Sequence, residues 1–129
     1  MFKRKIKIIL NEEDFIPSAK DLFKQHNYIV LKQSQKLAEE YIKLISQRIR
    51  YRHEHGALFA SFSRYGGNDI EEKVYRFFRF CDSGYTFEIV SLVQDIVFTY
   101  FRKLGYKIYW QKCNGLRNED EIYVSWELK

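Results

Sequence analysis

One segment constrains the fold of this chain more than any other, because it is apolar almost all the way around. The spacing of residues 86–104 predicts a helix whose polar side chains are confined to one narrow stripe of Ser91, Asp95 and Thr99. A helix with apolar residues on most of its circumference has to be covered on several sides. We therefore expect this helix to lie at the centre of the fold or to be buried in an oligomer.

Short strands are predicted both before and after this helix in the chain. Residues 106–112 and 121–128 have strand patterns, and Asn114-Gly115 between them favours a reversal of the chain, so we expect a C-terminal hairpin. Trp110 and Trp126 should then lie on neighbouring strands and pack against helix 86–104. Two further strands are predicted at residues 5–10 and 57–63.

The other helices are marked by their start and stop signals. Pro17 and Ser18 begin a short helix that we expect to end near residue 25, and a turn should follow at His26-Asn27. A second helix is predicted up to Gly56, because apolar residues recur at helical spacing at Val30, Leu37, Tyr41, Leu44, Ile45 and Ile49. An acidic first turn and apolar spacing predict another helix over residues 69–81.

These elements predict an α+β fold class. We expect a small antiparallel sheet, consisting of the C-terminal hairpin plus the N-terminal and middle strands, packed by three to four helices. The chain has 129 residues, of which 46% are apolar and 30% charged, so residues 1–129 should form a single domain with one core. No run approaches the length of a membrane span and no signal peptide is visible, so we expect a cytoplasmic protein without a membrane partner.

The charge of the chain is unevenly placed. The net charge of +5 lies wholly in residues 1–55, whereas residues 56–129 are balanced. A basic excess of this kind favours an anionic partner, such as nucleic acid or an acidic protein surface.

No cluster of residues carries a strong catalytic or metal-binding signature. Residues 53–55 place two histidines together but lack further ligands nearby, and Cys81 and Cys113 should both be reduced thiols without a nucleophile motif around them. The Glu-x-Lys triplets at residues 71–73 and 127–129 match one part of a metal-dependent nuclease site. Both triplets are also explained by a helix start and a chain end. We therefore predict no catalytic residues, no bound metal and no cofactor.

Basic and aromatic residues alternate in two regions of the chain. Arginine forks bind phosphates and exposed tyrosines stack on bases, although the same residue types also anchor protein interfaces. Arg48 and Arg52 are one helical turn apart and should share an exposed face. The predicted basic/aromatic surface consists of Arg48, Arg50, Tyr51, Arg52, Arg64, Tyr65, Lys73, Arg76 and Arg79.

The C-terminal third also carries a resemblance. A helix ending in Leu104-Gly105-Tyr106-Lys107-Ile108, a polar loop and then Ile122-Tyr123-Val124-Ser125-Trp126 resembles small accessory proteins encoded by tailed phages of low-GC bacteria. A basic amphipathic helix before a glycine, as at Gly56, belongs to the same pattern. The resemblance covers residues 37–60 and 90–126, and the chain departs from it by an insertion at residues 60–85 and by its N-terminal strand and helix. It implies a virus-encoded protein in the host cytoplasm without an assigned activity.

The sequence thus predicts a non-enzymatic interaction protein. Its partner should be a host or viral macromolecule, either protein or nucleic acid, bound through the basic/aromatic surface. Two alternatives stay open. The first is a virion or assembly component that forms a homo-oligomer, and the second is a small metal-dependent nuclease.

Overall fold

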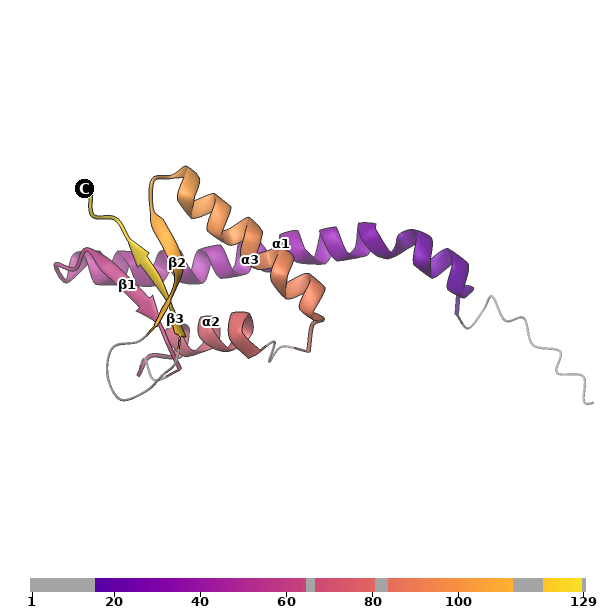
Figure 1. Cartoon of the computed structure of the whole chain (residues 1–129), viewed down its shortest axis with the longest axis horizontal. Coiled ribbons are helices and arrows are strands. Elements are labelled where there is room, and N and C mark those ends of the chain that lie inside the picture. Colours follow the sequence, from indigo (N-terminus) through magenta and orange to yellow (C-terminus); the bar gives the residue numbers. More distant parts are fainter. Residues whose placement is uncertain (1–15, 65–66, 81–83, 113–119, 129) are drawn as a thin grey trace, which may run out of the picture.

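The computed structural model describes residues 16–64, 67–80, 84–112 and 120–128. In chain order the elements are α1 (Ala19–Glu54), β1 (Phe59–Phe62), α2 (Asp69–Phe80), α3 (Phe87–Lys103), β2 (Lys107–Lys112) and β3 (Asp120–Ser125). The strands form an antiparallel sheet in the order β1-β3-β2, which lies beside the C-terminal half of α1 (Figure 1). The predicted α+β class is confirmed, whereas the predicted strand at residues 5–10 lies outside the described residues.

Helix α1 is one continuous helix, and the predicted turn at His26-Asn27 is wrong. Ser18 caps the helix by accepting a hydrogen bond from the Asp21 N–H at 3.2 Å. His and Asn are weak helix formers rather than breakers, and the helix contains neither glycine nor proline. His26 Nε2 also lies 2.9 Å from Glu88 Oε1 at the start of α3, and this contact joins the N-terminal part of α1 to the rest of the fold.

Both long helices end where the sequence predicted. Gly56 has φ +86° and Gly105 has φ +96°, a left-handed backbone conformation that glycine adopts without strain. Thr86 caps the start of α3, since its hydroxyl accepts from the Ile89 N–H at 3.4 Å. The local signals therefore fix the length of α3 and its direct entry into β2.

The register of the sheet separates a core face from an outer face. In the core face Val124 lies between Ala60 and Ile108, and Ile122 lies between Phe62 and Trp110. Most of these side chains are fully buried under the helices. Alternation along the strands places Phe59, Tyr123 and Tyr109 on the opposite face.

The two tryptophans lie in different surroundings. Trp110 lies on β2 as predicted, and its Nε1 donates to Gln94 Oε1 of α3 at 3.1 Å. Trp126 lies just beyond β3, and its ring faces His53 at 6.3 Å and Tyr106 at 6.4 Å between centroids. Among the described residues, the ring contacts of Trp126 are thus with α1 and with the residue before β2 rather than with α3, while its backbone N–H donates to the Leu58 carbonyl oxygen at 3.1 Å.

An aromatic cluster joins α1 to α2. The rings of Tyr41 and Phe77 stack with centroids 4.2 Å apart, and Phe78 meets Tyr41 edge-on at 5.5 Å. Tyr41 is 4% exposed and Phe77 is 2% exposed. Ring packing therefore helps to hold the short helix α2 to the long helix.

Burial of this cluster has a consequence at high pH. Burial raises the pKa of Tyr41 to about 12, and the neighbouring Glu40 carboxylate adds to the rise. The unfolded chain loses this proton first as the pH rises, so the free energy of unfolding should fall between pH 10 and pH 12 and be insensitive to this group below pH 10. Urea denaturation of wild type and Tyr41→Phe across this range tests the prediction. An equally steep fall in both proteins would contradict it.

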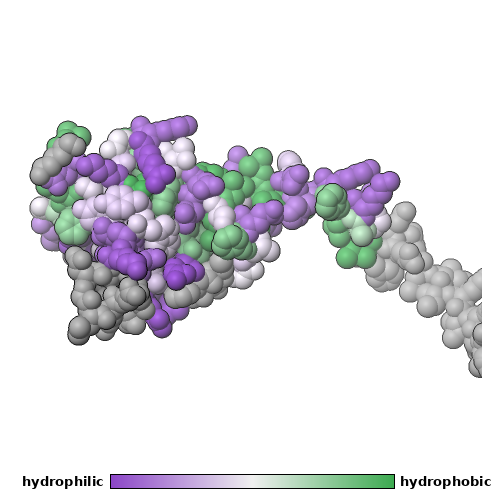
Figure 2. Space-filling model, viewed as in Figure 1, coloured by the Kyte–Doolittle hydropathy of each residue, from purple (hydrophilic) through white to green (hydrophobic). Residues whose placement is uncertain are grey.

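The N-terminal end of α1 projects beyond the other elements (Figure 1). Hydrophobic side chains are exposed there (Figure 2), with Phe23 81% exposed, and Phe87 at the start of α3 is 77% exposed. An assembly component would need such a surface, and that alternative stays a prediction. Among the described residues, none of the helices is both long enough and apolar enough to cross a membrane.

Candidate binding surface

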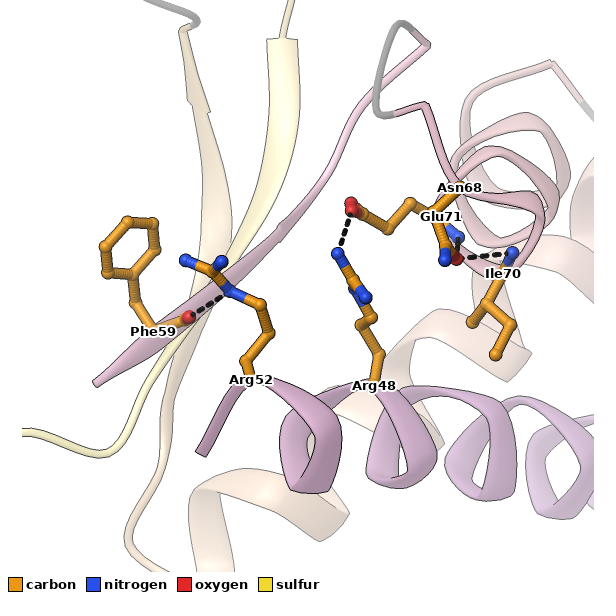
Figure 3. Close-up of polar contacts among 6 residues, drawn as sticks. All are labelled: Arg48, Arg52, Phe59, Asn68, Ile70 and Glu71. Carbon is orange, nitrogen blue, oxygen red and sulfur yellow. Dashed lines mark hydrogen bonds and ion pairs between the residues drawn. The ribbon is translucent and has the colours of Figure 1, made fainter. Parts of the chain in front are cut away.

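Arg48 faces the interior rather than solvent. Its Nη2 lies 3.0 Å from Glu71 Oε1 of α2, and the two side chains are only 14% and 8% exposed (Figure 3). Asn68 begins α2 and holds Glu71 in place, since its Oδ1 accepts from the N–H groups of Ile70 at 2.9 Å and Glu71 at 3.3 Å. Arg48 therefore ties α1 to α2, which differs from the exposed position that the sequence predicted.

Burial of the Glu71 carboxyl makes its charged form less favourable. Burial raises the pKa of Glu71 above its ordinary value, and the Arg48 guanidinium offsets part of that rise. Arg48 Nε is itself buried and has no hydrogen-bond partner among the described residues. The pair is thus a buried contact that depends on both members.

Arg52, one turn further along α1, lies over the first strand. Its Nε donates to the Phe59 carbonyl oxygen at 3.3 Å, and its guanidinium carbon is 5.3 Å from the centroid of the Phe59 ring (Figure 3). A guanidinium over an aromatic face is attracted by the ring quadrupole. Arg52 therefore reaches the edge of the sheet, and only part of its side chain is buried.

The remaining predicted residues are spread over the molecule. Lys73 Nζ lies 3.3 Å from Glu40 and Arg76 Nε lies 3.0 Å from Glu72, so these two cations pair with carboxylates. Tyr51 is 51% exposed and stacks on His55 with centroids 4.3 Å apart. Of the others, Arg50, Arg64 and Arg79 are exposed, and Tyr65 lies outside the described residues. The structure thus brings Arg48, Tyr51 and Arg52 together at the end of α1, and it pairs two of the α2 cations with acids.

The outer face of the sheet holds a set of residues that the sequence analysis missed. The Phe59 and Tyr123 rings stack with centroids 5.5 Å apart and an interplanar angle of 21°, and Tyr109 follows at 5.5 Å and 42°. We call Phe59, Tyr123 and Tyr109 the aromatic row. It crosses all three strands, with Phe59 41% and Tyr109 42% exposed. The partners of Tyr123 depend on the strand register, which joins residues distant in the chain.

Cations stand at both ends of the aromatic row. Arg52 covers Phe59 at one end, and Lys107 is exposed on the same face of β2 as Tyr109 at the other. Among the described residues, neither cation forms an ion pair with a carboxylate. Glu121, the acidic residue of β3 on this face, accepts a hydrogen bond from Gln111 Nε2 at 3.4 Å. The row is therefore a partly exposed aromatic surface with one cation over Phe59 and another beside Tyr109 on β2.

Several of the residues considered for catalysis or metal binding form other contacts. In the described part of the chain, no three His, Cys, Asp or Glu side chains are grouped so as to hold a metal ion. His55 Nδ1 donates to the Tyr51 carbonyl oxygen at 2.8 Å. Within the triplet at residues 71–73, each charged side chain contacts a partner of opposite charge. Both cysteines, Cys81 and Cys113, lie outside the described residues.

A comparison of the chain with protein-family models, with curated proteins and with solved structures finds no match.

Proposed function

We propose that this chain is a non-enzymatic interaction protein that binds nucleic acid on the outer face of its sheet. The observation that carries the proposal is the aromatic row, in which Phe59 stacks on Tyr123 and Tyr109 packs against Tyr123 at a tilt, with Arg52 and Lys107 beside it. Proteins that bind nucleic acid combine aromatic rings, on which bases stack, with cations that neutralise phosphates. The setting we propose is that of a phage accessory protein, as the sequence resemblance implies.

The charges around the row favour nucleic acid over a protein partner. The chain carries a net charge of +5, and the cations at the two ends of the row have no carboxylate bound to them among the described residues. By contrast Arg48, Lys73 and Arg76 pair with carboxylates and contribute less to an anion site. A polyanion is attracted most strongly by cations that carboxylates have not already neutralised. The proposed surface is therefore centred on the sheet, whereas the sequence predicted a surface formed by the end of α1 and by α2.

Fluorescence anisotropy with labelled mixed-sequence oligonucleotides at several salt concentrations tests this proposal. We expect binding that weakens with salt, with a log–log slope of about −0.7 per phosphate contacted on single strands. Lys107→Ala should weaken binding and flatten the slope by about 0.7. The matched control is Lys103→Ala, since Lys103 is also exposed but lies at the end of α3.

Two results would count against the proposal. Absence of binding to any oligonucleotide at low salt would favour a protein partner on the same surface. Equal effects of Lys103→Ala and Lys107→Ala would indicate attraction to the whole positive molecule rather than to the sheet face.

A further inference from the structure

The two ends of the aromatic row differ in what covers them. At the Phe59 end, the Arg52 guanidinium lies over the ring at 5.3 Å from its centroid, so this ring already has a cationic partner. At the other end, the only ring contact of Tyr109 among the described residues is with Tyr123, at 5.5 Å between centroids. Its strand, β2, is an edge of the sheet. The row therefore has a closed end at Arg52 and an open end at Tyr109.

The open end offers an aromatic face beside a cation. Tyr109 is 42% exposed, and Lys107 precedes it by two residues on the same strand, so both side chains leave the same face of the sheet. Each base has a flat π-face that stacks on tyrosine, and a neighbouring ammonium group binds the phosphate that follows. A nucleotide is the chemical group that combines these two features.

We infer that an unpaired base of single-stranded nucleic acid stacks on the exposed ring of Tyr109, while Lys107 binds the adjacent phosphate. This inference rests on the proposed function and specifies which form of nucleic acid the surface takes. In a duplex both faces of an internal base are covered by its neighbours, so only a single strand can present a base to the ring. Stacking is tolerant of base identity, and we expect weak sequence preference.

Substitutions at Tyr109 separate stacking from other contributions. Base–aromatic stacking corresponds to a loss of about 5- to 150-fold in affinity when the ring is removed. We expect Tyr109→Ala and Tyr109→Leu to weaken single-strand binding by that factor, and Tyr109→Phe to bind like wild type because it keeps the π-face. Tyr109→Leu keeps an apolar contact with Tyr123, so this variant still tests stacking if Tyr109→Ala fails to fold. The matched control is Tyr100→Ala, since Tyr100 is 43% exposed on α3.

A second readout reports on the base itself. The fluorescence of a single strand containing 2-aminopurine should change on binding to wild type and to Tyr109→Phe, and the change should be smaller with Tyr109→Leu. Salt-dependent binding that is equal for wild type, Tyr109→Leu and Tyr100→Ala would overturn the inference and leave the proposed function standing. Equal affinity for duplex and single strand would overturn it in the same way. Absence of binding by wild type to either form would overturn both.

Discussion

Replacing Arg48 with Ala is expected to lower the free energy of unfolding at pH 7 by about 3–5 kcal/mol, the range for breaking a buried ion pair from one side. The substitution leaves the Glu71 carboxylate, only 8% exposed, without the guanidinium that lies 3.0 Å away. It also removes a link between α1 and α2. Urea denaturation of wild type and variant measures the loss.

The pH dependence of this loss distinguishes an unpaired charge from lost packing. The folded-state pKa of Glu71 already lies above the ordinary value of 4.5, and removal of Arg48 should raise it further. Because the folded-state pKa of Glu71 is raised, this group stabilises the fold below pH 4.5. That contribution is lost as the pH rises through the folded-state pKa. The gap between Arg48→Ala and wild type should therefore be smallest near pH 4 and widen toward pH 7.

A solvent-exposed ion pair provides the control for this variant. Lys73 and Glu40 lie 3.3 Å apart with side chains 54% and 50% exposed, so Lys73→Ala should cost less than about 1 kcal/mol. If Arg48→Ala were destabilised by the same amount at every pH, the effect would come from packing alone. If it were as mild as Lys73→Ala, the pair would not support the α1–α2 contact.

Removing the Phe77 ring should have an effect of similar size. Phe77→Ala is expected to lower the free energy of unfolding by about 3–5 kcal/mol, because it deletes a large side chain that is 2% exposed. The ring packs against Tyr41 at 4.2 Å and Phe78 at 5.0 Å, so a cavity would open between α1 and α2. Thermal or urea denaturation provides the measurement.

Phe87 is the matched control for this substitution. It is 77% exposed in the first turn of α3, and Phe87→Ala should change stability by less than about 0.5 kcal/mol. A near-wild-type stability of Phe77→Ala would mean that α2 does not depend on this cluster.

Local signals were enough to predict most of the secondary structure. The caps at Ser18 and Thr86 mark helix starts, because their side chains accept hydrogen bonds from backbone N–H groups of the first turn. The glycines at positions 56 and 105 mark helix ends, because they adopt the left-handed backbone conformation that ends a helix. The predicted break at His26-Asn27 failed because propensity is a weak signal. Neither residue stops a helix, and the side-chain contact of His26 with Glu88 at 2.9 Å links this part of α1 to α3.

The basic/aromatic surface shows the limit of periodicity. A spacing of four residues correctly placed Arg48 and Arg52 on one face of a helix. Periodicity does not say what covers that face, and α2 buries Arg48 while Arg52 reaches the sheet edge. The exposure of each arginine was thus decided by an element that follows it in the chain.

The sequence by itself determined the α+β class and the helix ends at Ser18, Gly56, Thr86 and Gly105, because these depend on contacts within a few residues. Only the tertiary structure decided the strand order β1-β3-β2, which places Tyr123 between Phe59 and Tyr109. Strand pairing joins residues that are distant in the chain, and its register is set by the shared core of Ala60, Ile108 and Val124 rather than by the outer residues. The aromatic row and its cations are for that reason a product of the assembled sheet.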